Sequence, residues 1–307
     1  MAVIIRDFHP GDAEAVVRSR RATVPFLAVT PRSVLFDVET ANPAKRFRLL
    51  VAEEDGEVVG TAYAGIAYDS GVPGQGYVTP NVHPDHRGRG AGGSLLRTAE
   101  EHLAAHGATT VHAWVRDDPH STAFAAKRGY RPTRTAHFQH LDLARAVLPE
   151  PPGALPPGVA LRTAADYEDD PRPLFEADAE ATADEPGDIA AVLDDFDDWV
   201  RHTWNNPLFD RHLSTVVTVD GRVASYTAAH TDRETRYVSG MTGTLRAHRG
   251  RGLAKLAKAD SLRRARAAGL TDAYTSNDGA NGPMLAINRW FGYGICATEV
   301  RHVRTLG

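Results

Sequence analysis

The chain has 307 residues, which suits two domains of ordinary size better than one. Hydrophobic residues make up 42% and charged residues 24%, as in soluble globular proteins, and 35 basic against 39 acidic residues give a net charge of -4. This balance argues against a protein that coats nucleic acid. The single cysteine excludes an internal disulfide framework. Because no secretory leader pattern and no apolar run of about 18 residues occur, we expect a soluble, cytoplasmic protein without a membrane partner.

Two segments of the chain resemble each other and indicate an internal repeat. Residues 82–93 read VHPDHRGRGAGG and residues 245–256 read LRAHRGRGLAKL, with Arg87 and Arg249 lying 162 residues apart. A Gly-Tyr pair repeats further along at nearly the same offset. The constant spacing predicts two copies of one domain.

A proline-rich segment, LPEPPGALPPG at residues 148–158, separates the two copies. Five prolines and two glycines exclude a helix interior or a central strand there. We therefore predict an N-terminal domain at 1–147, a semi-rigid linker at 148–158 and a C-terminal domain at 159–307. The alternative is a long surface loop within one domain.

The predicted elements follow the same order in both copies. A short strand opens each copy, and an uneven, partly helical region of about 40 residues follows it. Asp55-Gly56 and Asp220-Gly221 each separate two strand-like runs, which is typical of a β-hairpin. In chain order the further predicted elements are strands at 77–82 and 237–245, a helix whose apolar face in the first copy is Leu95, Leu96, Ala99 and Leu103, strands at 110–115 and 272–276, a short helix ending at Gly129 or Gly292, and strands at 136–141 and 298–303.

The Arg-Gly-Arg-Gly turn between a predicted strand and a predicted helix favours phosphate binding. Glycine lets backbone N–H groups approach an anion, and the first N–H groups of a helix have no internal partner. Arginine adds charge and forked donors. The turn is neither a Walker loop nor a G-x-G-x-x-G fingerprint. Arg-Gly turns are also common on surfaces, but two of them in the same context favour a binding role.

These segments resemble motif A, R/Q-x-x-G-x-G/A, of the Gcn5-related N-acetyltransferases, the GNAT family. The motif reads RGRGAG at 87–92 and RGRGLA at 249–254, and the resemblance covers nearly the whole chain as a tandem pair. It implies an α/β fold of mixed α+β type: two tandem GNAT domains, each a splayed mixed sheet flanked by helices, with acetyl-CoA in the splay. The cofactor-binding residues implied are Val82, His83, Arg87, Gly88, Arg89, Gly90, Ala91, Gly92, Gly93, Ser94, Thr244, Leu245, Arg249, Gly250, Arg251, Gly252, Leu253, Ala254 and Asn281.

The resemblance implies an acyltransferase that moves an acetyl group to an amine of a small molecule or peptide, such as a natural-product or antibiotic amine. The neutral amine would attack the thioester directly in a ternary complex, and a backbone N–H at Val82 or Leu245 would stabilise the oxyanion. One copy would be catalytic and the other degenerate. The alternatives are a non-catalytic acyl-CoA-binding or sensor protein and a GNAT-fold enzyme that uses another acyl-CoA.

The residues that would carry proton transfer depart from the family pattern. Many members place a tyrosine four residues before the Gly-Phe/Tyr pair, where this chain has Ala125 and Asn288. Asn281 keeps a CoA-contacting asparagine of the family, whereas the first copy has Asp118. The catalytic residues are therefore unknown, and His120, Ser121 and Asn288 are weak candidates.

The region before each hairpin, which usually lies on the acceptor side of this fold, differs in charge between the copies. Residues 166–198 contain fourteen acidic residues and one basic residue, Arg172. A cationic small molecule or peptide N-terminus is the acceptor that such a surface favours, and a solvated acidic helix face without a ligand is the alternative. His83 and His86 lack a third ligand, so we expect no metal. Cys296 is expected in the core.

Overall fold

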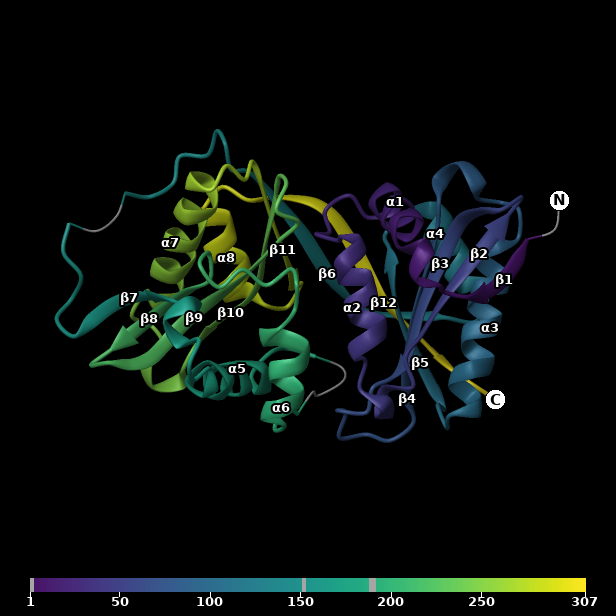
Figure 1. Ribbon diagram of the computed structural model, residues 1–307, viewed down its shortest axis with the longest axis horizontal. Coiled ribbons are helices and arrows are strands. Elements are labelled where there is room, and N and C mark those ends of the chain that lie inside the picture. Colours follow the sequence, from purple (N-terminus) through teal and green to yellow (C-terminus); the bar gives the residue numbers. More distant parts are fainter. Residues whose placement is uncertain (1–2, 151–152, 188–191) are drawn as a thin grey trace. The chain divides into compact units, whose positions relative to one another are not determined.

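A computed structural model of the chain describes residues 3–150, 153–187 and 192–307. The chain divides into two compact units (Figure 1). The first unit comprises Met1–Ala136 and Ala297–Gly307, and the second comprises His137–Cys296. The two halves of the chain contain the same order of elements, so the repeat seen in the sequence is a structural repeat.

The helices and strands match between the halves one by one. In the first half they are β1 (Ile4–Asp7), α1 (Ala13–Thr23), α2 (Pro31–Thr40), β2 (Arg48–Glu54), β3 (Glu57–Ile66), β4 (Gln75–Val82), α3 (Ala91–Ala105), β5 (Thr110–Arg116), α4 (Pro119–Ala126) and β6 (Arg131–Asp142). In the second half they are β7 (Val159–Thr163), α5 (Arg172–Ala183), α6 (Phe196–Trp199), β8 (Thr215–Val219), β9 (Arg222–Thr231), β10 (Arg236–Thr244), α7 (Leu253–Ala267), β11 (Asp272–Asp278), α8 (Gly282–Trp290) and β12 (Gly294–Thr305).

The last strand of each half completes the sheet of the other unit. In the first unit the strand order is β1-β2-β3-β4-β5, and the end of β12 follows β5. Its register runs antiparallel to β5 from Glu299 opposite Arg116 to Thr305 opposite Thr110. In the second unit the order is β7-β8-β9-β10-β11, and the end of β6 follows β11. The chain therefore exchanges its two equivalent last strands.

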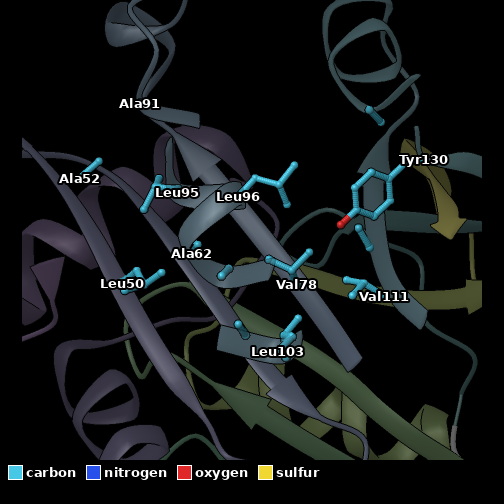
Figure 2. Close-up of a cluster of buried hydrophobic side chains, with 14 of the residues drawn as sticks. Leu50, Ala52, Ala62, Val78, Ala91, Leu95, Leu96, Leu103, Val111 and Tyr130 are labelled. Atoms are coloured by element: carbon cyan, nitrogen blue, oxygen red, sulfur yellow. The ribbon is translucent and has the colours of Figure 1, made fainter. Parts of the chain in front are cut away.

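Helices cover both faces of the first unit's sheet. Successive side chains of β2 point to opposite faces of the sheet. Val51 therefore lies on the face covered by α1 and α2, and Leu50 lies on the face covered by α3. The predicted apolar face of α3 is confirmed, because Leu95, Leu96, Ala99 and Leu103 are all buried. Figure 2 shows Leu95, Leu96 and Leu103 in one cluster with Val78 of β4 and Val111 of β5.

The second unit has an aromatic cluster beneath α5 and α6. Phe175, Trp199 and Trp204 pack there with Tyr226 of β9. Residues Val200–Trp204 continue α6 as a π-helical turn. On the other face of the sheet, α7 packs Leu253 and Ala257 against buried strand residues. Each unit thus has a core on both faces of its sheet.

Two neighbouring parallel strands separate in each unit. β4 and β5 pair only from Gln75 opposite Thr110 to Tyr77 opposite His112. β10 and β11 pair only from Arg236 opposite Asp272 to Ser239 opposite Thr275. Beyond these pairs, the ends of β4 and β10 have a free edge, and the predicted splayed mixed sheet is confirmed.

The two hairpins match the sequence prediction, and the environment of Cys296 differs from it. Both Asp-Gly pairs form hairpin turns with positive φ at both residues, as predicted. Cys296 is exposed, so its predicted core position is wrong: it follows the exposed residue Ile295 at the start of β12. The predicted domain limits stay a prediction, and residues 151–152 of the linker lie outside the described residues. No helix in the described part of the chain is long and apolar enough to cross a membrane.

Candidate active site

The glycine turn of the first unit presents unpaired backbone donors at the start of α3. Gly88 has a φ of 79° and Gly90 a φ of 97°, conformations that side-chain-bearing residues rarely adopt. The first helical hydrogen bond runs from the Ser94 N–H to the Gly90 carbonyl oxygen at 3.1 Å. The N–H groups of residues 91–93 precede it and have no intrahelical acceptor. A Cβ at Gly88 or Gly90 would meet nothing within 4 Å, so the turn is open.

Side chains on both flanks hold the turn in place. Arg87 donates from Nε to the Val82 carbonyl oxygen at 3.3 Å, which ties the turn to the end of β4. Arg89 donates to Glu54 at 2.9 Å, and His86 lies 3.0 Å from the same carboxylate oxygen. These contacts, with that of His86 the larger, hold the pKa of Glu54 below its usual value. Arg89 is thus an anchor, whereas the terminal nitrogens of Arg87 bond to none of the described residues.

A cavity of ≈ 440 Å³ opens beside the turn. Its walls come from α3 and the end of α4: Gly90, Gly93, Ser94, Leu96, Arg97, Glu100 and Arg128. Arg128 stacks on the Phe124 ring at 3.5 Å from the centroid, and burial lowers its pKa. A Cβ at Gly93 would lie 2.8 Å from the Arg128 guanidinium, so this glycine makes room for the arginine. Gly93 and Ser94 were predicted from the motif, whereas Arg97 and Arg128 were not, since arginines outside the motif carry no positional signal.

The free edges of β4 and β10 offer different numbers of backbone donors. The His83 N–H donates to the Val59 carbonyl oxygen of β3 at 2.8 Å, so by alternation the Val82 N–H faces away from β3. Pro80 faces the same way and has no N–H. The Leu245 N–H donates to the Ala224 carbonyl oxygen at 3.0 Å. Leu245 is therefore not an oxyanion donor.

In the second unit the donors of the free edge come from two threonines. The same alternation turns the N–H groups of Thr242 and Thr244 away from β9. Thr244 is the counterpart of Val82, because Arg249 donates from Nε to its carbonyl oxygen at 3.0 Å, as Arg87 does to that of Val82. The Leu245 N–H, predicted as one of two alternative oxyanion donors, is thus engaged with β9, and the N–H that corresponds to that of Val82 belongs to Thr244.

The turn of the second unit has the same backbone and different neighbours. Gly250 and Gly252 both have a φ of 76°, and α7 starts at Leu253. Asp184, which follows α5, accepts hydrogen bonds from Arg246 and from Arg249. The repeat offset places Ala259 and Phe291 where the first unit has Arg97 and Arg128. The arginines that flank the first cavity therefore have no counterparts here.

The predicted catalytic candidates occupy structural positions. Asn288 is fully buried, accepts from Lys258 at 2.6 Å, and donates to Gln139 at 2.8 Å and to Asn277 at 2.6 Å. Ser121 donates its hydroxyl to Asp118 at 2.8 Å within the cap of α4. His120 is exposed at the start of the same helix.

The predicted CoA-contacting asparagine of the second copy is a helix cap. The side chain of Asn281 accepts from the Met284 N–H at 3.3 Å at the start of α8. Asp118 accepts from the Ser121 N–H at 2.9 Å at the start of α4. The two matching positions therefore share this structural role.

Glu299 is an ionisable residue that sequence reasoning missed. It lies in the first unit, directly opposite Arg116, and opposite residues of an antiparallel pair share a face. Arg116 donates to the Thr23 carbonyl oxygen at the end of α1 at 3.0 Å, so this is the face covered by α1 and α2. Burial raises the pKa of Glu299 to about 7, although Arg116 opposes the shift. The residue is far from the first copy in sequence, and only strand exchange brings it there.

The acidic segment of the second copy is largely engaged within its own unit. Asp178 accepts from the Tyr226 hydroxyl at 2.5 Å and from the Trp199 indole at 2.7 Å. Asp195 caps α6, and Asp198 pairs with Arg201 at 3.2 Å. Asp188 lies outside the described residues. Much of the acidity thus serves caps and ion pairs.

Comparison with known proteins agrees with this arrangement. Residues 18–130 match the model of the Acetyltransferase (GNAT) family. Mycothiol acetyltransferase of Nocardiopsis dassonvillei is 28% identical over 94% of this chain and 92% of its own length. Mycothiol acetyltransferase of Thermomonospora curvata is 30% identical over 84% of this chain and 83% of its own length.

Solved structures share the fold over the whole chain. A GCN5-related N-acetyltransferase from Sphaerobacter thermophilus has a TM-score of 0.69 and 25% identity, covering 99% of this chain and 95% of its own. A tandem GNAT protein from the clavulanic acid biosynthesis pathway has a TM-score of 0.74 and 24% identity, covering 100% and 99%. The chain therefore belongs to the GNAT acetyltransferase family. It is an acyltransferase built from two GNAT repeats, as the motif resemblance predicted.

Proposed function

We propose that the chain is an acetyl-CoA-dependent N-acetyltransferase whose cofactor binds in the first unit. The observation that carries this proposal is the open glycine turn beside a cavity with two arginines. Unpaired N–H groups at a helix start, together with Arg87, Arg97 and Arg128, match the several negative charges of a CoA molecule. The turn of the second unit is open in the same way, but its Arg249 is paired with Asp184, and Ala259 and Phe291 stand at the positions of Arg97 and Arg128.

The residues present fit the parts of the cofactor. The pyrophosphate would be held by the turn at 87–92, and the phosphorylated adenosine by Arg97 and Arg128. The pantetheine arm would lie along the free edge of β4, where Val82 supplies an N–H. Pro80 leaves that N–H as the single donor near the thioester, so Val82 is the oxyanion donor in this proposal.

The bound cofactor supplies an acetyl thioester. A neutral amine attacks its carbonyl carbon, a C–N bond forms, and the C–S bond breaks to release the CoA thiolate. We assign the general base to Glu299, which lies opposite Arg116, beyond the point where β4 and β5 stop pairing. Its pKa of about 7 suits a base that works near neutral pH. The proton that the base takes from the amine leaves for solvent, and the thiolate needs no acid because thiol pKa values are modest.

The acceptor is proposed to be the amine of a small molecule. The support is the name of the relatives, mycothiol acetyltransferase, and the biosynthetic setting of the tandem structural relative. The face that carries Glu299 also carries Arg116, so an acceptor with an anionic group next to its amine fits it. This class differs from the cationic acceptor that the acidic segment favoured, because that segment lies in the other unit.

Binding measurements on turn variants test the proposal. Gly90→Asp places a carboxylate where the pyrophosphate would lie, and Gly90→Asn is the matched neutral control, since both side chains tolerate positive φ. Isothermal titration with acetyl-CoA is expected to show binding by wild type and by Gly90→Asn, with at least a tenfold larger Kd for Gly90→Asp. Equal affinity in all three proteins would contradict the proposal. Binding without turnover of any amine would favour the acyl-CoA sensor.

A further inference from the structure

Two carboxylates at the end of α5 contact the residues that lead into the second glycine turn. The Arg246 N–H donates to Glu180 at 2.6 Å. Arg246 donates from its guanidinium to both oxygens of Asp184, at 2.8 and 2.6 Å, and Arg249 donates to Asp184 at 2.5 Å. Asp184 thus pairs with Arg249, the second unit's equivalent of Arg87, whose Nε bonds to β10.

The first unit contains no such contact among its described residues. The last turn of α1 carries Arg20 and Arg21 where α5 carries its acids, so the helix end cannot pair with Arg87. Pro84 stands at the position of Arg246 and has neither an N–H nor a charge. The two turns have nearly the same backbone, and their flanking charges are opposite.

Resting on the proposed function, we propose that Glu180 and Asp184 act as a carboxylate latch on the second glycine turn, so that the chain binds one acetyl-CoA, in its first unit. We call Glu180 and Asp184 the latch residues. A cofactor phosphate approaching this turn meets arginines that are already paired. It must also lie beside two carboxylates of the same sign as itself.

The packing of α5 keeps Glu180 and Asp184 next to the second glycine turn. Ala181, between the two acids, packs against Gly243 of β10, where an added Cβ would lie 2.7 Å from the Ala181 side chain. Asp178, one turn earlier, is fixed by Tyr226 and Trp199. Because α5 is held at these points, Glu180 and Asp184 lose little additional freedom when they bind the arginines.

The latch is closed at all physiological pH values. Hydrogen bonds from Arg246, and then from Arg249, lower the pKa of Asp184 to about 2. The facing groups on the neighbouring elements are Arg246, Arg249 and Glu180, and the two arginines remain charged. Opening therefore requires displacement of the carboxylates rather than their protonation.

Native mass spectrometry of the full chain with acetyl-CoA tests the latch. The test variants are Asp184→Asn and the double variant Glu180→Gln/Asp184→Asn, which keep the size of each side chain and remove its charge. Glu176→Gln is the matched control, because Glu176 is an exposed acid on the same helix. Wild type and Glu176→Gln are expected to bind one equivalent, which Gly90→Asp removes. The double variant is expected to bind two, and adding Gly252→Asp returns it to one.

The outcomes separate the latch from the proposed function. Two equivalents bound by wild type, or no additional equivalent in the double variant, would overturn the latch. A wild type that binds nothing, with a double variant that gains one equivalent sensitive to Gly252→Asp, would support the latch and contradict the proposed cofactor site in the first unit. Circular dichroism of each variant establishes that it is folded, and Asp184→Asn alone, at a half-exposed side chain, is the variant that perturbs packing least.

Discussion

Burial moves the pKa values of two ionisable side chains, Glu299 and Lys258, to about 7. For Glu299 burial disfavours the carboxylate and raises the pKa to about 7, and for Lys258 burial disfavours the ammonium and lowers the pKa to about 7. Glu299 lies on the face of the first unit that α1 and α2 cover, whereas Lys258 is fully enclosed in the second unit. We therefore propose a role in the chemistry for Glu299 and expect Lys258 to affect stability.

Replacement of Glu299 by glutamine is expected to lower kcat/KM about 100-fold at pH 8, since loss of a general base typically costs 10²–10⁴ in rate. A base works deprotonated, so the wild-type rate should rise with pH through about 7 and then level off. The variant should lose this inflection. Initial rates of CoA release across pH 6–9 provide the measurement, and Glu57→Gln, an exposed acid at the start of β3, is the control. An unchanged inflection in Glu299→Gln would show that another group titrates.

Lys258 makes the second unit's stability depend on pH. Its folded pKa lies below its unfolded value of 10.5, so the unfolded state binds more protons between about 7 and 10.5 and stability rises with pH there. From pH 7 to pH 9 the gain is about 2 kcal/mol for a shift of this size. Lys258→Met should lack this gain, as measured by urea unfolding of both proteins at the two pH values. A stability difference between them that is the same at pH 7 and pH 9 would contradict this prediction.

At the scale of elements, the glycine turn depends on the strand that precedes it and on Glu54 at the end of β2. Glu54 holds both His86 and Arg89, so it fixes the segment between β4 and α3. The turn itself was predictable, because glycine at two positions and arginine at two others form a local pattern. Glu54 was not, since its role depends on a contact 35 residues away along the chain.

Removal of the Glu54 side chain is expected to weaken cofactor binding indirectly, through the residues that Glu54 holds in place. Glu54→Ala releases His86 and Arg89, the turn loses its fixed geometry, and the Kd for acetyl-CoA should rise about tenfold, or 1.4 kcal/mol. Isothermal titration measures the change, and Glu57→Ala is the nearby exposed control. If Glu54→Ala bound acetyl-CoA as wild type does, the anchor would have no part in cofactor binding.

Local sequence patterns predicted most of the helices and strands, but they did not predict which residues far apart in the sequence contact one another. The hairpins at Asp55-Gly56 and Asp220-Gly221 and the apolar face of α3 follow from neighbouring residues alone. The position of Asn288 in a buried network with Lys258 does not, because no periodicity reveals which polar residues meet inside a core. The bond from the Leu245 N–H to β9 was not predictable either, since the sequence alone does not show which N–H groups of a strand face its neighbour.

At the scale of the whole molecule, strand exchange makes each unit depend on the other half of the chain. The extended character of residues 136–141 and 298–303 predicted strands, but it does not show which strand each one pairs with. The end of β12 belongs to the first unit. Arg304 pairs there with Glu100 at 2.7 Å, and His302 is buried. The proposed base, Glu299, reaches the first unit in the same strand.

Deletion of residues 297–307 is therefore expected to destabilise the first unit. The deletion exposes the edge of β5 and leaves Glu100 without its arginine, at a cost of about 3 kcal/mol or more. Hydrogen exchange should show loss of protection in β5 and α3 and little change in β8 and β9. Deletion of residue 307 alone is the control. Undiminished protection in β5 after the larger deletion would mean that β12 contributes little to this sheet.

We propose above all that the first unit holds the acetyl-CoA that the enzyme uses. The most direct measurement is the release of CoA from acetyl-CoA with a panel of small-molecule amines, for wild type, Gly90→Asp and Gly252→Asp. We predict that Gly90→Asp abolishes amine-dependent release and that Gly252→Asp retains it. Loss of release in Gly252→Asp, with activity intact in Gly90→Asp, would place the chemistry in the second unit and contradict the account.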